Sequence, residues 1–286
     1  MRRTLGKVYR KNRSMFWIVC WVLPLVPAKV WSQTGDTTDN GQKQEVYDFI
    51  LLNAKFNDRF TFMGRDFGQT IPTLSTDVMY YFHTGLYFNV SAFRFLEPEI
   101  PYQYALSLGY QTDLSAKTDL NVSYSQFLVS GSSEVTGIQN MGFLQGTFGL
   151  DWDYLYSTLQ LQGLFNDKTD VFISSQHSRY FEFDQRLFKT ITVSFEPAFS
   201  FMWGTSRFYH LGGFGENLLD AASELENLRF LTWEIMLPLN LEWNGWGMEF
   251  QYRYVHPVNT PEFDESGGRF IFGGQLTYSL PIKKMR

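Results

Sequence analysis

The dominant pattern along the chain is a two-residue alternation of apolar and polar side chains. Between residues 190 and 204, apolar side chains occupy the positions from Ile191 to Trp203, and mostly polar ones occupy the positions between them. A β-strand displays alternate residues on opposite faces. This segment is therefore predicted to be a strand with one apolar face and one polar face. The same period recurs in residues 102–111, 231–243, 246–254 and 270–280.

Repeated along the chain, the alternation predicts twelve strands. They are expected near residues 58–65, 75–83, 85–95, 102–112, 117–128, 141–152, 154–165, 169–183, 189–204, 228–243, 245–256 and 268–281. The pattern is weakest in residues 169–183. Asn244-Gly245 is the clearest turn, since both residues accept the positive φ of a type I′ hairpin. Pro197 and Pro238 fall inside strands and lack the N–H of a ladder, which predicts a bulge or a register change at each.

The predicted connections fall into two length classes. Links that follow odd-numbered strands are mostly long, whereas links that follow even-numbered strands are mostly short. This asymmetry is typical of outer-membrane barrels, which have short periplasmic turns and longer extracellular loops. An even number of strands also returns both termini of the barrel segment to the periplasmic side.

Strand length decides whether the apolar face meets lipid or a protein core. A soluble barrel shows the same alternation with its apolar face inward. Strands of globular proteins cluster at about 5–6 residues, whereas a tilted transmembrane strand needs about 9–11, and most of these run to ten or more. Four tryptophans at strand ends are candidates for an interfacial aromatic girdle: Trp152, Trp203, Trp243 and Trp246. We therefore expect an all-β fold, a single antiparallel transmembrane β-barrel of about 12 strands with its apolar face toward lipid.

The polar face of the same strands is then expected to line a lumen. Nine charged residues are the candidate lumen-lining positions: Arg59, Arg65, Asp77, Asp151, Glu196, Glu234, Glu242, Glu249 and Arg253. Arg253 is expected to pair with Glu234 across a hairpin. Buried charges must be paired or hydrated, so the lumen is either a salt-bridged plug or a water-filled path. A twelve-stranded barrel is intermediate in size between small barrels filled by side chains and the large porins. The strand count therefore does not decide between a plug and a water-filled path.

The first 57 residues are expected to precede the barrel. Residues 1–32 join a basic segment to a short apolar core and small residues near Ser32, which is typical of a secretory signal peptide cleaved there. Residues 33–57 are expected to be a short periplasmic segment in which Val46, Phe49 and Ile50 form one face of a small helix. Residues 58–286 are expected to form the barrel. Cys20, the one cysteine, lies within the signal peptide, so the mature protein is expected to lack thiols and disulfides.

Composition narrows the class of partner. Aromatic residues make up 18% of the chain, yet its mean hydropathy is only −0.21, and no apolar run long enough for a membrane helix follows residue 35. Without residues 1–32 the chain holds 17 Lys and Arg against 29 Asp and Glu, a net charge of −12. A nucleic-acid partner requires a basic surface, so none is expected.

Two stretches of the barrel carry a family resemblance. Residues 64–93 and 231–261 are similar to the signal-peptide-bearing outer-membrane β-barrels of Bacteroidota, most of which have no assigned function. The resemblance implies a barrel in a Gram-negative outer membrane and transfers no active site. The last strand also resembles a recognition signal for the outer-membrane assembly machinery, with Gly273, Leu276 and Tyr278 suitably spaced, although a terminal aromatic residue is missing.

The sequence offers little catalytic chemistry. A membrane phospholipase pattern needs a serine two residues from a histidine on a lipid-facing strand; Ser175 and His177 have that spacing in the reverse order. Because the histidines are dispersed along the chain, no structural metal site is expected, and no cofactor is expected. The long loop at 205–227 is expected to act as a lid or constriction.

The resulting hypothesis is a passive, porin-like channel for small polar solutes. Its expected partners are outer-membrane lipid, the assembly machinery and the solutes themselves. The alternatives are a lipid hydrolase or acyltransferase at the membrane face, with His177 as the residue to test, and a non-transporting structural or surface-binding barrel.

Overall fold

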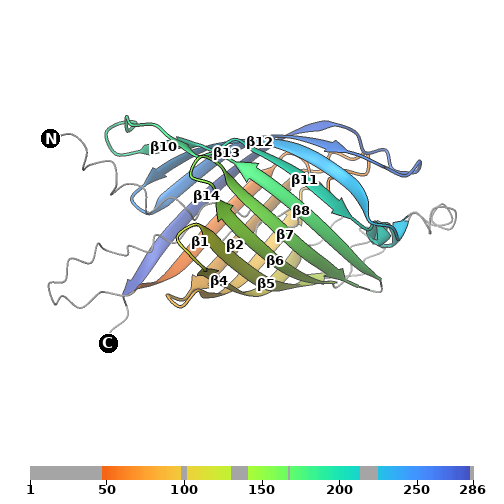
Figure 1. Ribbon diagram of the computed structural model, residues 1–286, viewed down its shortest axis with the longest axis horizontal. Coiled ribbons are helices and arrows are strands. Elements are labelled where there is room, and N and C mark those ends of the chain that lie inside the picture. Colours follow the sequence, from red (N-terminus) through yellow and green to blue (C-terminus); the bar gives the residue numbers. More distant parts are fainter. Residues whose placement is uncertain (1–46, 98–101, 130–140, 167, 213–224, 284–286) are drawn as a thin grey trace.

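The protein forms one closed β-sheet in a computed structural model that describes residues 47–97, 102–129, 141–166, 168–212 and 225–283 (Figure 1). The described elements are β1 (Tyr47–Asn57), β2 (Thr73–Tyr81), β3 (Leu86–Phe95), β4 (Gln103–Asp113), β5 (Thr118–Val129), β6 (Met141–Asp151), β7 (Tyr156–Phe165), β8 (Thr169–Ser178), β9 (Phe181–Glu182), β10 (Thr192–Phe195), β11 (Ala198–Gly204), the 3₁₀ helix η1 (Arg207–Gly212), β12 (Arg229–Trp243), β13 (Trp246–Pro257) and β14 (Arg269–Lys283). Among these residues no helix has the length and apolar character of a membrane span. The predicted signal peptide lies outside the described residues.

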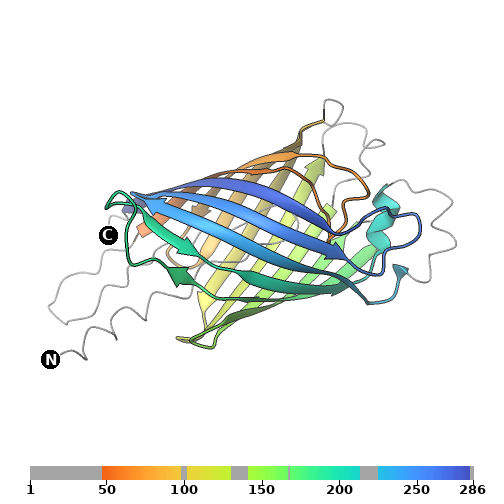
Figure 2. The same cartoon turned by 90° about the horizontal axis from the view of Figure 1, so that it is seen from above.

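The strands pair in chain order, and the sheet closes on itself. β1 pairs with β14, and β11 pairs with both β8 and β12. β10 and β11 are two parts of one wall strand interrupted at Glu196 and Pro197, and β9 extends the hairpin beyond β8. The wall therefore has twelve strands, all antiparallel to their neighbours, as predicted. Figure 2 shows the strands strongly tilted to the long axis of the barrel, as closure requires.

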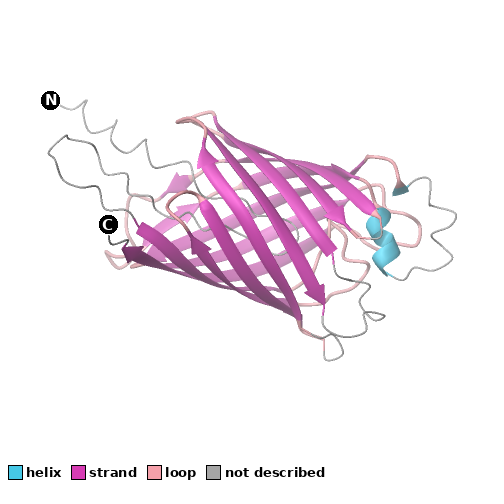
Figure 3. Ribbon diagram, turned by 90° about the horizontal axis from the view of Figure 1, so that it is seen from below, coloured by secondary structure: helices cyan, strands magenta, loops and turns pink. Residues whose placement is uncertain are grey.

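The two ends of the barrel differ in the length of their connections. We call them the long-loop end, where η1 lies (Figure 3), and the short-turn end. The long-loop end carries residues 58–72, 205–212, 225–228 and 258–268. The short-turn end carries residues 82–85, 114–117, 152–155 and 244–245. Asn244 and Gly245 have φ values of 46° and 83°, so the positive-φ turn predicted for this pair is confirmed.

Apolar side chains face outward and polar ones inward along most of the wall. In β4 the outward Leu108 is 55% exposed, while its inward neighbour Ser107 is 2% exposed. A soluble barrel has the opposite arrangement, with its apolar residues inside. Without water, a bilayer tolerates only a barrel whose backbone bonds are closed and whose outer face is apolar. The architecture is therefore that of a transmembrane barrel.

The prediction of a first strand at residues 58–65 was wrong. The first strand is β1 at Tyr47–Asn57, within the segment predicted to be periplasmic, so Phe49 and Ile50 lie in a strand and not in the predicted helix, and Val46 lies outside the described residues. Residues 58–65 belong instead to the loop 58–72, where Met63 and Gly64 adopt φ values of 49° and 78° and reverse the chain. Phe62 and Arg65 close this reversal through mutual backbone hydrogen bonds of 2.8 and 2.9 Å. Arg59 and Arg65 therefore lie outside the strands on which they were predicted.

The two strand prolines interrupt the ladder without shifting it. Phe195 pairs with Leu239 and Ala198 with Met236, so the register is the same on both sides of Pro197. The prediction of a bulge or a register change at the prolines was wrong. A bulge occurs further along, between Met202 and Trp203 of β11, because β12 carries one additional residue there.

Candidate functional site in the barrel lumen

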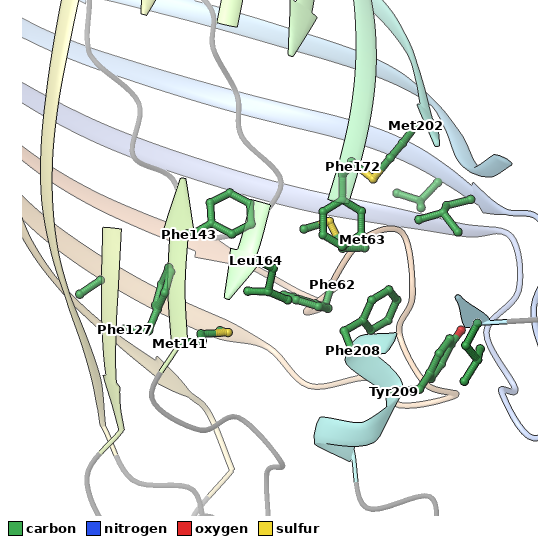
Figure 4. Packing of buried hydrophobic residues seen from close by; sticks show 14 of the residues in the cluster. Phe62, Met63, Phe127, Met141, Phe143, Leu164, Phe172, Met202, Phe208 and Tyr209 are labelled. Carbon is green, nitrogen blue, oxygen red and sulfur yellow. The ribbon is translucent and has the colours of Figure 1, made fainter. Parts of the chain in front are cut away.

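The long-loop end of the interior is filled by apolar side chains that two loops contribute. We call the group formed by Phe62, Met63, Phe208, Tyr209 and the wall residue Phe172 the mouth cluster (Figure 4). Phe62 comes from the loop 58–72 and meets the ring of Phe208 from η1 edge-on, with centroids 5.2 Å apart. All five residues are buried. The described part of the loop 205–227 thus lies in the barrel mouth, where the sequence predicted a constriction; residues 213–224 lie outside the described residues.

A fully buried arginine fixes the loop 58–72 to the wall. Arg65 donates from Nη1 to the carbonyl oxygen of Leu231 at 2.9 Å and from Nη2 to that of Val258 at 2.7 Å. Its Nε lies 3.7 Å from the carboxylate of Asp264. A buried guanidinium requires such partners, and these come from β12 and from the loop 258–268.

The same carboxylate joins η1 to this anchor. The hydroxyl of Tyr209 donates a hydrogen bond to Asp264. Burial raises the pKa of the Tyr209 phenol, and the negative charge of Asp264 adds to the rise. The phenol therefore keeps its proton and remains a hydrogen-bond donor. Arg65, Asp264 and Tyr209 link three loops at the long-loop end.

A second group of charges holds the outer part of this loop. Asp66 forms ion pairs with Arg59 at 2.7 Å and with Arg269 at 3.3 Å. The hydroxyl oxygen of Ser266 accepts hydrogen bonds from the backbone N–H groups of Asp66 and Phe67. The loops 58–72 and 258–268 are thus connected by both charged and neutral contacts.

Ionisable side chains concentrate on one side of the lumen. We call this side the charged wall: Lys55 on β1, Asp77 on β2, Glu234 on β12, and Glu249 and Arg253 on β13. Asp77 accepts a hydrogen bond from Asn53 at 3.2 Å, and Asn53 in turn accepts one from Thr277 at 3.1 Å. The wall carries three carboxylates and two cationic groups.

Glu234 has an unusual place on the charged wall. It is fully buried, and neither of its carboxylate oxygens has a hydrogen-bond partner among the described residues. Glu234 lies opposite Val255, which makes Arg253 its diagonal neighbour on β13. Arg253 donates to the hydroxyl of Thr61 at 3.2 Å. The predicted pair of Glu234 and Arg253 is therefore adjacent across the hairpin, as expected, but it is not hydrogen-bonded.

The opposite side of the lumen is uncharged at the middle of its strands. We call the following set the neutral wall: Asn89, Ser91, Ser107, Asn121, Ser123, Gln145, Thr147, Gln160, Gln162 and Ser174, from strands β3 to β8. Amide and hydroxyl groups of these residues bond to one another. Gln160 donates to Thr147 at 3.1 Å and accepts from Ser174 at 3.1 Å. The lumen-lining positions predicted from the sequence were all charged, so the neutral wall was not among them.

The remaining predicted lumen residues lie toward the short-turn end. Asp151 accepts the backbone N–H of Asp153 at 2.7 Å and closes the turn 152–155. Glu196 is buried at the β10–β11 interruption and accepts a hydrogen bond from Ser178 at 2.7 Å. Glu242 occupies an inward position near the end of β12. The four candidate girdle residues occupy outward positions at or beside strand ends: Trp152, Trp203, Trp243 and Trp246.

His177 contacts Ser157, a serine that was not among the predicted site residues. His177 and Ser157 are register partners on β8 and β7, and the serine Oγ lies 2.8 Å from the imidazole Nδ1. Both residues occupy outward positions near the short-turn end. The indole N–H of Trp152 donates to the same Oγ at 3.1 Å. Only the strand register brings Ser157 and His177 together, so spacing along the chain could not reveal them.

No protein-family model and no curated protein matches the chain. Solved structures do resemble it. LpxR from Salmonella typhimurium has a TM-score of 0.50 at 8% identity, covering 80% of this chain and 99% of LpxR. The KdgM porin has a TM-score of 0.47 at 9% identity, covering 81% and 99%. An outer membrane channel from Pseudomonas putida F1 has a TM-score of 0.45 at 9% identity, covering 86% and 100%. At these identities the likeness to LpxR shows a shared barrel fold and transfers no site.

Proposed function

We propose that the protein is a passive channel for small polar solutes in a bacterial outer membrane. The observation that supports this most strongly is the inner surface of the barrel. Along the middle of its strands it is polar on every side, with charged groups on one wall and amides and hydroxyls on the other. These polar groups are not all paired within the protein, since neither carboxylate oxygen of Glu234 has a hydrogen-bond partner among the described residues, and buried polar groups need partners that water or a polar solute can supply.

The two ends of the barrel then have distinct roles. By the length of its connections, the long-loop end faces the outside and the short-turn end faces the periplasm. The mouth cluster restricts entry from outside, and the charged wall sets which solutes pass. The outward leucines and tyrosines contact lipid. We also propose that the chain is cleaved near Ser32 and that the outer-membrane assembly machinery inserts the barrel. Its source is proposed to be a member of the Bacteroidota.

Planar-bilayer recording of the purified, refolded protein tests the channel function. We expect discrete conductance steps in potassium chloride that vanish after heat denaturation. The variant Phe208→Ala should show larger or longer openings, because it removes a ring from the mouth cluster. A barrel that keeps its strand content in detergent and yet shows no conductance in either form would contradict the proposal and favour a structural role.

The Ser157–His177 contact favours a second candidate function, hydrolysis of a lipid ester at the membrane face. Imidazole within hydrogen-bonding distance of a hydroxyl is the arrangement that activates a serine nucleophile. The serine oxygen would attack the acyl carbonyl while His177 takes its proton. His177 would then return that proton to the departing alkoxide, and water would release the acyl group from Ser157. The outward position of the pair places it beside lipid.

Hydrolysis of phospholipid dispersed in detergent tests this second candidate. We expect released fatty acid to fall to background in Ser157→Ala and in His177→Ala if the contact is catalytic. Ser125→Ala, an inward serine on β5, is the matched control. Equal hydrolysis in all variants, or none in the native protein, would leave the contact as a polar pair that bridges β7 and β8.

A further inference from the structure

The neutral wall retains hydrogen-bonding capacity that the protein itself does not use. The Oδ1 of Asn89, the Oγ of Ser107, the Nδ2 of Asn121 and the Oε1 of Gln162 are buried without a partner among the described residues. The other amide atoms of Asn89 and Gln162 are engaged, since Asn89 donates to Ser91 at 2.9 Å and Gln162 donates to Gln160. Buried polar atoms are nearly always paired in folded proteins, so each of these positions points to a group that comes from outside the chain.

These four residues form one continuous patch. Asn89 and Ser107 are register partners on β3 and β4. Tyr87, two residues before Asn89, donates to Asn121 at 3.2 Å. Gln162 pairs with Gln145, which pairs with Ser123 on the same strand as Asn121. The patch therefore spans β3 to β7 on the inner surface.

The patch offers both acceptors and donors and has no charge. Amide oxygens accept, amide nitrogens donate, and a serine hydroxyl does both. A solute that satisfies such a mixture must itself donate and accept at closely spaced positions without carrying a net charge. Adjacent hydroxyl groups have this property.

The charged wall, which faces this patch, also favours neutral solutes over anions. Its carboxylates on Asp77, Glu234 and Glu249 outnumber the cationic groups of Lys55 and Arg253. Glu234 keeps both oxygens without a hydrogen-bond partner, so it can accept from a hydroxyl and repel an anion. Like charges brought together at low dielectric repel strongly.

We propose that the lumen selects small neutral molecules rich in hydroxyl groups, the chemistry of sugars and polyols, and disfavours sugar acids. This inference rests on the proposed channel function and specifies its substrate class. Asn89, Ser107, Asn121 and Gln162 bind the passing hydroxyl groups on one side, and Glu234 accepts from them on the other.

Uptake of labelled arabinose and labelled glucuronate into proteoliposomes tests the proposal, with potassium conductance measured on the same preparation. We expect arabinose to enter about fivefold faster than glucuronate or more. Gln162→Leu and Asn89→Leu should lower arabinose uptake about fivefold each, the effect of losing one hydrogen bond of ordinary strength, while potassium conductance persists. Leu161→Met, at the outward position next to Gln162, is the matched control and should change neither uptake.

Two isosteric variants keep the test valid if leucine disturbs folding. Gln162→Glu should preserve arabinose uptake and reduce glucuronate uptake further, whereas Glu234→Gln should raise glucuronate uptake. Conductance accompanied by glucuronate uptake equal to or above that of arabinose would overturn the substrate class and leave the channel intact. Absence of both conductance and uptake from a folded barrel would overturn the channel function, and the substrate class with it.

Discussion

The guanidinium of Arg65 donates a 2.9 Å hydrogen bond to the carbonyl oxygen of Leu231, the residue at the bulge in β12. Leu231 has no register partner in β11, because Met202 pairs with Thr232 and Trp203 pairs with Phe230. Its carbonyl points to the other side, where it accepts from the backbone N–H of Val258 in line with β13 and from Arg65. Bulges are common at the rims of barrels. Leu231, at the bulge, is thus the attachment point for the loop that supplies Phe62 and Met63 to the barrel mouth.

Replacing Arg65 with methionine should release that loop. The variant keeps an apolar stem but leaves Asp264 and two carbonyl groups without the guanidinium, a change that costs about 3–5 kcal/mol when a buried pair is broken. We expect a lower urea midpoint for refolded protein and a higher open probability in bilayers. Lys117→Met, at the exposed pair with Asp153, should change neither. Native gating in Arg65→Met would show that the arginine does not hold the mouth closed.

Truncating Phe208 should enlarge the passage directly. Its ring is buried between the rings of Phe62, Phe172 and Tyr209. Removing a buried phenylalanine side chain costs about 3–5 kcal/mol, and here the space it leaves lies in the barrel mouth. We expect Phe208→Ala to raise single-channel conductance, whereas Phe188→Ala, at a position 80% exposed, should leave it at the native value. Equal conductance in the two variants would mean that solutes bypass the mouth cluster.

Alternation predicted the wall well wherever one face of a strand was apolar and the other polar. It placed the strands after the first to within a few residues, apart from the splitting of 189–204 at Pro197 and the early end of β8 at Ser178. It failed for β1, because Phe49 and Leu51 face inward and pack with Met79 at the short-turn end. Apolar side chains on both faces conceal the period of a strand.

The candidate site was less accessible to sequence reasoning, for a physical reason. Residues 58–65 alternate as a strand does, yet their apolar side chains fill the mouth, and only the positive φ at Met63 and Gly64 marks the reversal. The approach of Arg65 to Leu231 spans 166 residues. Strand register and loop folding bring such groups together, and neither can be read from the pattern of a single sequence. The neutral wall could have been found, because its amides and serines occur at every second residue.

Neutralising Glu234 should alter the ionic preference of the channel. Glutamine has the shape of glutamate, and neither carboxylate oxygen accepts a hydrogen bond from a described residue, so the substitution removes charge with little loss of contacts. We expect the reversal potential in a potassium chloride gradient to shift toward chloride in Glu234→Gln. Glu262→Gln, on the exposed part of the loop 258–268, is the control for a charge at the rim. A shift of equal size in the control would mean that surface charge, and not the charged wall, sets the preference.

Two leucines close together in the chain test whether the outer surface contacts lipid. Leu108 and Leu114 are exposed to almost the same extent, 55% and 56%, but Leu108 lies within β4 and Leu114 lies in the turn that follows it. Arginine on the lipid face costs about 2–4 kcal/mol at the bilayer midplane and about 0–1 near the interface. Leu108→Arg should therefore lower the free energy of unfolding from phospholipid vesicles far more than Leu114→Arg, as measured by urea titration of tryptophan fluorescence. In water an exposed leucine tolerates arginine at either site, so equal stability of the two variants would mean that β4 does not face hydrocarbon.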